Sequence, residues 1–375
     1  MAYFRGSSGK RRDRDDRAAS PPKAAAHPRA QASPVGSPSA LPAAQPTGQP
    51  TGRVQYPLRR AYAALDLGTN NCRMLIARPD GDSFTIVDAF SRIVRLGEGL
   101  AASGTLSDAA MDRAVSALGV CATKLARRNV YLSRAVATEA CRRASNGQHF
   151  VDRVARETGI ILDIIDPEEE AKLAVMGCHR LLPTGDGPAL IFDIGGGSTE
   201  LALVDTAGDE PQTLDWVSVP WGVVSLSETV PQDGADEAAR LAHYAEMTGI
   251  VADSLSGFFA RLPRNGGARL LGTSGTVTTL ASVFLNLPSY DRKQVDGLSA
   301  PVAAMRDISH DLARRSIADR ALVPCIGQER ADLVVAGCAI LDAIFDAWPA
   351  EHVGVADRGI REGILRQLFK LDARR

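Results

Sequence analysis

The sequence predicts an α/β protein with two similar lobes, and three stretches carry this prediction. Two of them, AYAALDLGTNNCRMLIA (61–77) and ALIFDIGGGSTELAL (189–203), each place an apolar strand before an aspartate, a glycine turn and a returning strand. The third, GTSGTVTTLASVF (272–284), opens an apolar helix with glycine, serine and threonine. Because one pattern begins both halves, we infer an internal duplication, with a first lobe over 61–185 and a second over 186–375.

The first 60 residues differ from the rest in composition. They hold nine of the 21 prolines and 11 Lys/Arg against three Asp, with little hydrophobic periodicity. Such a segment buries too little apolar surface to offset its ordering entropy, so we expect residues 1–60 to be a disordered basic Pro/Ala-rich tail. The remaining chain carries a net charge of −9, so a site for a polyanion must be a local basic pocket.

Composition limits the class of protein and its compartment. With 45% hydrophobic and 23% charged residues, the chain is typical of a globular protein. No apolar run reaches the roughly 18–20 residues of a membrane span, and no apolar core follows the N-terminal arginines, as a secretory signal requires. The six cysteines include no CxxC pair. We therefore expect a cytoplasmic protein with reduced cysteines and no membrane partner.

Alternating patterns predict strands and helices in turn through the first half. Three strands cover 62–97, with Asp80-Gly81 as a hairpin turn. Ser107 caps a helix over 107–129 whose apolar residues recur at helical spacing. The elements that follow are a strand (131–140), a helix (150–159), a buried strand (160–165) and a helix that begins at Pro167 and runs to 182.

The second half repeats the opening strands after a turn-rich linker (182–188). Its predicted strands are 189–194, 200–204, 213–219 and a late one near 352–356. Its predicted helices lie near 235–260, 275–286, 301–318, 329–347 and 359–371. Each half therefore opens with a strand, an acidic glycine turn and a returning strand.

A strand that ends in aspartate and turns through glycine is suited to phosphate. Glycine lets backbone N–H groups approach an anion, hydroxyls bind phosphate oxygens, and the aspartate can hold Mg²⁺ directly or through water. GGGSTE lacks the lysine and the spacing of a Walker A loop. The helix that begins near Gly275 adds an anion site at its N-terminus. Together these features are the layout of the actin-like ATPase fold, in which two ribonuclease-H-like lobes flank an interlobe cleft.

Seven motifs resemble those of one family. LDLGTNNCRMLIA, AVATEACRRASNG, EEEAKLAVMG, DIGGGSTEL, VPWGVVSLSE, GTSGTVTTLA and VADRGIREGIL occur in the order, and near the spacing, of the exopolyphosphatase/guanosine pentaphosphatase (Ppx/GppA) family. The resemblance covers about residues 61–371. It implies a phosphohydrolase that releases terminal orthophosphate from inorganic polyphosphate, the 5′-γ-phosphate from pppGpp, or both, by Mg²⁺-assisted in-line attack of water. The chain is similar to short members that lack a C-terminal HD-type domain.

The resemblance also implies roles for individual residues. Glu170 matches the residue that activates the attacking water, and Arg142 matches the arginine that grips substrate phosphate. Asp193, Glu200 and Asp66 match the acids on the metal side of the cleft. The residues expected to bind phosphate, taken from the loops, the Gly275 helix and nearby arginines, are Gly68, Thr69, Asn70, Arg73, Arg92, Gly195, Gly196, Gly197, Ser198, Thr199, Gly275 and Thr276.

Other interpretations stay open. The helix dipole alone explains glutamates in a first helical turn, which suffices for Glu168 and Glu169. Three positions depart from the family pattern: Asn71 in the first loop, Lys172 after the acids, and Asp296, whose charge would repel a polyanion. The rival functions are a non-catalytic module that binds ppGpp or polyphosphate and a sugar- or acetate-type kinase on the same fold. The sequence leaves the choice between polyphosphate and pppGpp open, is compatible with a homodimer, and predicts no specific nucleic-acid partner.

Overall fold

The computed structural model describes residues 60–374, except 82, 184, 186, 209, 233, 235 and 263–268. The tail predicted for residues 1–60 lies outside these described residues apart from Arg60. No helix in the described ranges is long and apolar enough to cross a membrane.

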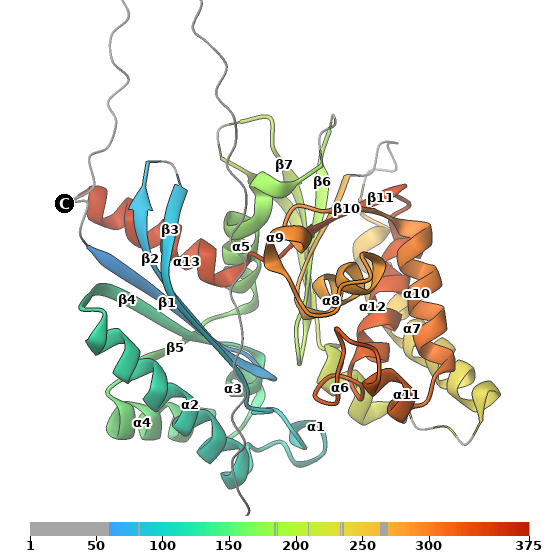
Figure 1. The fold of residues 1–375 in the computed structure, drawn as a ribbon, viewed down its shortest axis with the longest axis horizontal. Helices are drawn as coiled ribbons and strands as arrows, with labels where there is room; N and C mark the ends of the chain where they lie inside the picture. Colours follow the sequence, from blue (N-terminus) through green and yellow to red (C-terminus); the bar gives the residue numbers. More distant parts are fainter. Residues whose placement is uncertain are drawn as a thin grey trace, which may run out of the picture. The chain divides into compact units, whose positions relative to one another are not determined.

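The first lobe is built on a five-stranded sheet (Figure 1). Its strands are β1 (Ala61–Leu67), β2 (Asn71–Asp80), β3 (Ser83–Ile93), β4 (Val130–Ala137) and β5 (Leu162–Ile164), in the spatial order β3-β2-β1-β4-β5. The pairs β1–β2 and β2–β3 are antiparallel, whereas the pairs β1–β4 and β4–β5 are parallel. One face packs on the two long helices of the lobe, α2 (Asp108–Arg127) and α4 (Gly147–Thr158). In the sequence, the short helix α1 (Leu100–Ser103) precedes α2, and the short helix α3 (Glu139–Arg143) precedes α4.

The second lobe repeats this topology. Its strands are β6 (Ala189–Ile194), β7 (Thr199–Asp205), β8 (Gln212–Val219), β9 (Arg269–Thr273), β10 (Ser299–Pro301) and β11 (His352–Ala356), in the order β10-β11-β9-β6-β7-β8. The run β8-β7-β6-β9-β11 matches β3-β2-β1-β4-β5, with antiparallel pairs on one side of β6 and parallel pairs on the other. The predicted duplication and the actin-like α/β fold are thus confirmed.

Helices cover the second sheet on one face and form the largest core cluster. They are α6 (Val223–Thr229), α7 (Glu237–Phe259), α8 (Gly275–Phe284), α9 (Arg292–Val295), α10 (Val302–Arg314), α11 (Ile317–Ala321) and α12 (Val334–Ala347). α12 lies at the centre of this layer, since it contacts α6, α7, α8 and α10. Its residues 334–345 are all buried because an almost wholly apolar helix needs packing on every side.

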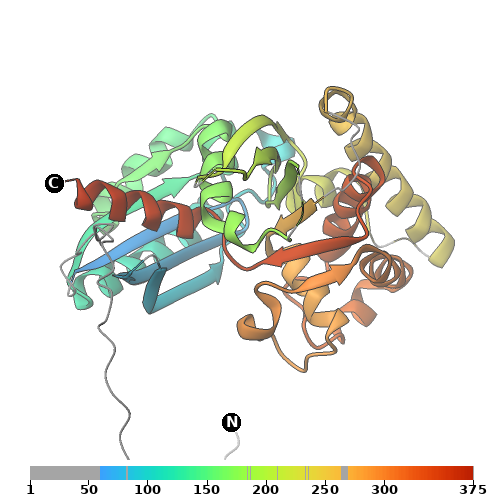
Figure 2. The ribbon, with the colours of Figure 1, turned by 90° about the horizontal axis from the view of Figure 1, so that it is seen from above.

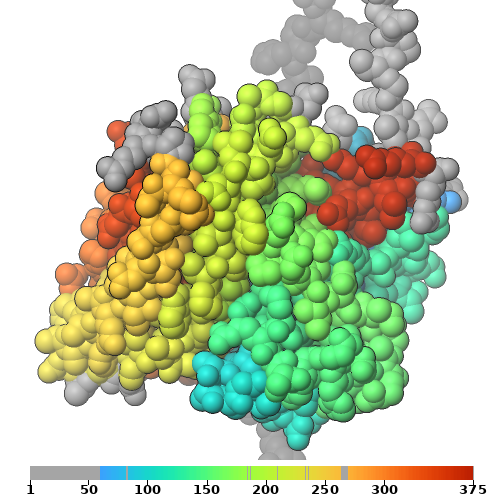
Figure 3. All heavy atoms as spheres, turned by 180° about the vertical axis from the view of Figure 1, so that it is seen from behind, coloured from blue at the N-terminus to red at the C-terminus, as the bar shows by residue number. Residues whose placement is uncertain are grey.

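Two helices connect the lobes, and each packs on a sheet. α5 (Pro167–Cys178) follows the first sheet in sequence, but its Val175 and Cys178 pack on β6, β7 and β9 of the second. α13 (Ile360–Ala373) lies in the range that the sequence assigned to the second lobe, yet it covers β1, β2 and β4 of the first. Figure 2 shows β11 leading into α13, and Figure 3 shows α13, in red, against the green and teal segments of the first lobe.

The crossing of α5 and α13 depends on glycine. A Cβ on Gly177 would lie 2.0 Å from the carbonyl oxygen of Gly359, and one on Gly363 would lie 2.1 Å from that of Leu173. The two helix backbones are therefore in direct contact. At Gly177 and Gly363 the backbones of α5 and α13 are too close for any side chain larger than the hydrogen of glycine.

Most predicted elements are present, with the long helices most accurately placed. Ser107 caps α2 and Pro167 begins α5, as predicted. The buried strand expected over 160–165 is wrong in extent: β5 has three residues, and Ile161 is 74% exposed. The helix expected to reach 182 ends at Cys178, where a 3₁₀ turn follows. β9 was not predicted because its short apolar run merges with the glycine motif that follows it.

Candidate active site

A cleft between the two lobes is lined by loops from both sheets. It contains nearly all the residues singled out from the sequence: Asp66, Gly68, Thr69, Asn70, Arg73, Glu170, Asp193, Gly195, Gly196, Gly197, Ser198, Glu200, Gly275 and Thr276. Glu139, Ser274, Thr279 and Arg330 line it as well and were not predicted. The duplicated fold explains this convergence, because β1 and β6 occupy equivalent positions and end at the same cleft.

The two glycine loops have the same hydrogen-bonding pattern. The Gly68 amide donates to the Asn71 carbonyl at 2.9 Å, and the Gly195 amide donates to the Ser198 carbonyl at 2.9 Å. Each hydrogen bond closes a turn around two residues, 69–70 in the first loop and 196–197 in the second. The duplication extends from the sheet order to the conformation of the loops.

Backbone carbonyls in both loops are used by neighbouring segments. The Asn70 carbonyl accepts from Val94 at 2.8 Å, and the Gly196 carbonyl accepts from Val224 at 2.8 Å. The amides of Thr69, Asn70, Gly196, Gly197 and Ser198 make no hydrogen bond within the described ranges. Unpaired amides beside satisfied carbonyls form the nest arrangement that binds anions. The backbone of both loops is therefore prepared for phosphate oxygens.

Gly196 and Gly197 have a second reason to be glycine. A Cβ on Gly196 would lie 2.9 Å from Thr69 Cβ, and one on Gly197 would lie 2.7 Å from Thr69 Oγ1 and 3.0 Å from Glu139 Cγ. Both positions face the other lobe rather than open space. These glycines permit the two loops to meet across the cleft, in addition to exposing backbone amides.

A third wall of the cleft comes from the start of α8. Ser274 has φ = 144°, a strained conformation for a residue other than glycine, and its hydroxyl caps Val277. The helix N-terminus beyond it presents Gly275 and Thr276 to the cleft. Arg330 also lines this wall and donates to Thr279 Oγ1 at 2.8 Å.

Four carboxylates lie together in the cleft: Glu170 and Glu200 are buried, and Asp66 and Asp193 are partly exposed. Burial, with Glu200 and Asp66 nearby, raises the pKa of Asp193 to about 8. Burial also raises the pKa of Asp66, although Arg73 opposes that shift, and it raises the pKa of Glu200. Glu200 accepts a hydrogen bond from Ser218 at 2.8 Å. This crowding disfavours negative charge unless a cation enters the cleft.

The acids fit a metal ion that is held mainly by substrate and water. Among the described residues, no group of three or more His, Cys, Asp or Glu side chains is arranged to enclose a metal. Mg²⁺ commonly uses only one or two protein carboxylates and completes its shell with phosphate oxygens and water. Asp193 and its neighbours match that partial donor set, and burial together with the charges of Glu200 and Asp66 raises the pKa of Asp193.

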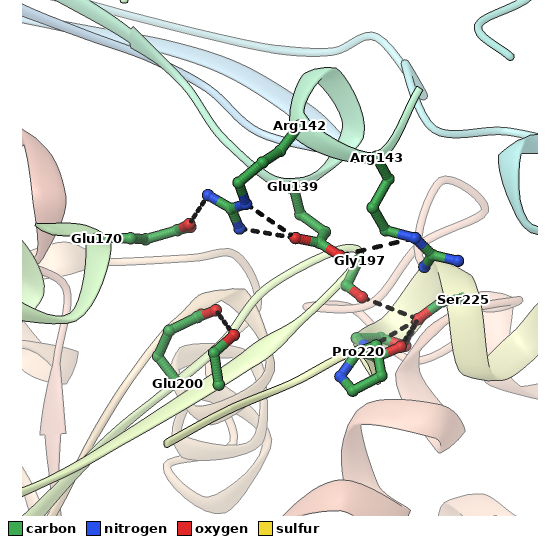
Figure 4. A network of polar contacts seen from close by, with 10 residues as sticks. Glu139, Arg142, Arg143, Glu170, Gly197, Glu200, Pro220 and Ser225 are labelled. Carbon is green, nitrogen blue, oxygen red and sulfur yellow. Dashed lines mark hydrogen bonds and ion pairs between the residues drawn. The ribbon is translucent and has the colours of Figure 1, made fainter. Parts of the chain in front are cut away.

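Glu170 lies in the first turn of α5, where Asp166 caps the helix and Pro167 fixes its start. Its Oε2 accepts from Arg142 Nη1 at 3.0 Å (Figure 4). Arg142 in turn contacts Glu139 through Nε at 3.2 Å and Nη2 at 2.7 Å. Burial raises the pKa of Glu170 well above its usual range, with Glu200 adding to the shift and Arg142 opposing it. A buried carboxyl with a raised pKa is a candidate general base.

Arg142 has a different place from the one predicted. It does not line the cleft, and its Nη1 also donates to the Ile165 carbonyl at 2.7 Å. The guanidinium of Arg142 thus binds Glu139, Glu170 and this carbonyl, and it fixes the position of the Glu170 carboxylate. To contact a substrate phosphate, the guanidinium of Arg142 would have to leave these partners.

Two predicted phosphate ligands, Arg92 and Thr199, are not among the residues that line the cleft. Arg92 is exposed and lies on the edge strand β3, paired with Cys72. Side chains alternate along a strand, so Arg92 points to the face opposite that of Asp66 and Arg73. Thr199 is fully buried, and its hydroxyl donates to the Trp221 carbonyl at 2.7 Å instead of facing the cleft.

Two of the three residues that depart from the family pattern, Lys172 and Asp296, form ion pairs outside the lining of the cleft. Lys172 is exposed and pairs with Glu168 one turn away at 2.5 Å. Asp296 does not line the cleft; it accepts from Arg358 Nε at 2.7 Å and from the Asp357 amide at 3.0 Å. The carboxylate of Asp296 is thus paired with Arg358 outside the lining of the cleft. Asn71, the third departure, does line the cleft.

The comparison that decides the family is a match over residues 75–371 to the model of the "Ppx/GppA phosphatase family". The chain belongs to the Ppx/GppA phosphatase family. As a member of this family it is a hydrolase, and the resemblance seen in its motifs is confirmed.

Individual relatives agree with this assignment. The chain is 29% identical over 312 residues to a putative exopolyphosphatase of Haemophilus influenzae, which covers 83% of this chain and 92% of that protein. It is 30% identical over 312 residues to a guanosine-5′-triphosphate,3′-diphosphate pyrophosphatase of Aeromonas salmonicida, covering 82% of this chain but 59% of that one.

Solved structures of the family share the fold. The crystal structure of the Aquifex aeolicus Ppx/GppA family member has a TM-score of 0.69 and 26% identity, covering 84% of this chain and 99% of that one. An exopolyphosphatase-like protein has a TM-score of 0.75 and 27% identity, covering 83% of this chain and 99% of that one.

Proposed function

We propose that this Ppx/GppA protein releases terminal orthophosphate from inorganic polyphosphate, from pppGpp, or from both. The observation that carries the proposal is the position of Glu170, whose carboxyl lines the cleft that holds two facing loops with unpaired amides. A base and anion-binding amides in one cleft are the parts that phosphoryl transfer to water requires.

Glu170 would accept the proton of the attacking water. Because its pKa is raised, it is a stronger base than a free carboxylate once ionised. Arg142 fixes the carboxyl by a 3.0 Å contact and keeps it within the cleft. The water would be oriented by a side chain that cannot rotate freely.

The terminal phosphate would be held by the amides of Thr69, Asn70, Gly196 and Gly197. Arg73 lines the same cleft, and burial together with Arg361 lowers its pKa. An anion that binds beside an arginine in such surroundings stabilises its charged form. Arg330 and the start of α8 supply further positive potential on the opposite wall.

Asp193, with Asp66 or Glu200, would hold Mg²⁺. The ion, when bound, would neutralise phosphate oxygens and so favour transfer to water.

The test is phosphate release from long-chain polyphosphate and from pppGpp by the purified protein with Mg²⁺. Turnover of either substrate supports the proposal, and the faster one identifies the preferred substrate. If both substrates bind without phosphate release, the protein is a regulatory binding module and the proposed activity is wrong.

A further inference from the structure

Helix α6 begins directly against the second glycine loop. A Cβ on Gly222, the residue before the helix, would lie 2.4 Å from the carbonyl carbon and 2.5 Å from the carbonyl oxygen of Gly196. The Val223 amide donates to the Gly195 carbonyl at 3.0 Å, and the Val224 amide donates to the Gly196 carbonyl at 2.8 Å. The first amides of a helix lack partners within the helix, and here they bind the loop.

The next carbonyl of the loop is bound by a side chain. Ser225 Oγ lies 3.1 Å from the Gly197 carbonyl oxygen (Figure 4), and it accepts from the Gly222 amide at 2.9 Å. The carbonyls of Pro220 and Gly222 lie farther from this hydroxyl, at 3.3 Å each, and Gly222 already accepts from the Leu226 amide. Gly197 is thus the nearest acceptor for the hydroxyl proton, and its carbonyl has no other donor in the described part of the chain.

A bound carbonyl fixes the direction of the amide on the same peptide. Each peptide unit is planar and trans, so its N–H points away from its C=O. The carbonyls of Gly195, Gly196 and Gly197 point to α6. The amides that follow, on Gly196, Gly197 and Ser198, therefore point the opposite way, toward the cleft that these residues line. The orientation of this half of the anion nest depends on α6.

Backbone amides hold the equivalent carbonyls of the first glycine loop. The Thr69 carbonyl accepts from Gly97 at 2.9 Å, and the Asn70 carbonyl accepts from Val94 at 2.8 Å. A backbone amide is present whatever the side chain, whereas the third contact of the second loop is lost with one hydroxyl. Because Ser225 is 7% exposed, that loss would leave a buried carbonyl without a donor, which is destabilising.

We propose that Ser225 is a positioning residue of the phosphate site: its hydroxyl orients the Gly197–Ser198 peptide so that the Ser198 amide faces the substrate phosphate. This inference rests on the proposed function and adds Ser198 to the amides that hold the terminal phosphate. Ser225 is not among the residues that line the cleft, so it acts only through the loop. Phosphoryl transfer depends mainly on positioning and charge stabilisation, so an amide that turns away weakens both binding and turnover.

The test compares the intact protein with its Ser225→Ala variant, which lacks the hydroxyl. We expect the Kd for inorganic phosphate, measured by calorimetry with Mg²⁺, to rise about tenfold and kcat/KM for polyphosphate to fall about tenfold, as the loss of a hydrogen bond to a charged group implies. Ser225→Thr restores the hydroxyl and should recover most of both losses. If Ser225→Ala does not fold, Ser225→Cys fills the same space with a weaker donor and should show losses in the same direction.

The matched control is Ser227→Ala on the same helix. Removal of this hydroxyl also breaks two hydrogen bonds, since Ser227 Oγ donates to the Val223 carbonyl at 2.5 Å and accepts from Gln232 Nε2 at 2.6 Å. Both partners lie outside the glycine loop, so the Kd for phosphate should equal that of the intact protein. A loss that reflected only weakened packing of α6 would appear in both variants.

An unchanged Kd for phosphate in Ser225→Ala overturns the role of Ser225. An equal loss in Ser227→Ala does so too, as does a failure of Ser225→Thr to recover binding. An intact protein that binds phosphate but releases none from either substrate overturns the proposed function instead. The two failures are distinguishable because the Kd is measured without turnover.

Discussion

Arg142 Nη1 lies 3.0 Å from Glu170 Oε2, and the opposite edge of the same guanidinium contacts Glu139. The side chains of Glu139, Arg142 and Glu170 are 12%, 17% and 9% exposed, so the three charges interact with little screening by solvent. One arginine is therefore shared between the candidate base and a second carboxylate. The position and the proton affinity of Glu170 both depend on that arrangement.

Replacement of the candidate base should abolish most activity. For Glu170→Gln we expect kcat to fall about 10²–10⁴-fold, the usual contribution of general-base catalysis, with KM for the substrate little changed. Initial rates of phosphate release measure both. Glu168→Gln is the control, because Glu168 occupies the same helical turn but is 49% exposed and pairs with Lys172. Equal losses in the two variants would contradict a specific role for Glu170.

The shared arginine predicts a change in pH dependence. Glu170 acts as a base only when ionised, so activity should fall as the pH drops through its raised pKa, above the usual range of a carboxyl. Glu139→Gln removes one negative charge and leaves Arg142 to favour ionised Glu170, against the opposing charges of Glu200 and Asp66. The acid limb of kcat/KM against pH should therefore move to lower pH.

An Arg143→Gln variant serves as the control for this shift. Arg143 touches Glu139 at 3.8 Å and has no contact with Glu170, so the acid limb should move little. A limb that stays in place in Glu139→Gln, or moves to higher pH, would show that Glu139 does not act through Arg142.

The loop contact across the cleft can be tested with one methyl group. In Gly197→Ala the new Cβ would lie 2.7 Å from Thr69 Oγ1, which forces the two loops apart. We expect kcat/KM to fall about tenfold or more, while circular dichroism shows a folded protein. Gly249→Ala in α7 is the control, since nothing lies within 4 Å of its added Cβ, and it should keep full activity. Retained activity in Gly197→Ala would mean that the loops separate during turnover.

The ionised carboxylate of Asp193 should lower the stability of the folded protein when neither metal nor substrate is bound. Its pKa of about 8 exceeds the unfolded value of 3.8, so the folded state binds the extra proton between these limits. Stability therefore falls as pH rises through that window, and the penalty is complete above pH 8.

Asp193→Asn removes this penalty. In EDTA at pH 8.5 its Tm should exceed that of the unmodified protein by roughly 2 °C or more, since about 1 kcal/mol moves Tm by about 2–4 °C in domains of this size. The difference should shrink near pH 4, where the unmodified Asp193 is protonated. Calorimetric scans at both pH values measure it, and a Tm gain that is equal at both would disprove the assigned pKa shift.

Much of the site could be predicted because its residues follow strands directly. Asp66 and Asp193 are the second-last residues of β1 and β6, and the glycine loops come next in the chain, so a local pattern identified both. Glu139 and Arg330 could not be found this way. Glu139 is one of many charged residues beside a strand end, and Arg330 reaches the cleft only because α12 and α8 pack together. A lone charge carries no local signal of its distant neighbours.

The sequence by itself determined the duplicated α/β lobes and the two acidic glycine loops, because strand and helix periodicity and turn chemistry are local properties of the chain. Glu170 was singled out by the resemblance of EEEAKLAVMG to the family motif. The tertiary structure decided what depends on contacts between distant segments. It placed α13 on the first sheet, turned Arg92 away from the cleft, and set Gly196 and Gly197 against Thr69. Those outcomes follow from which face of a strand packs inward and how closely two backbones approach, and both are fixed only when the lobes fold against each other.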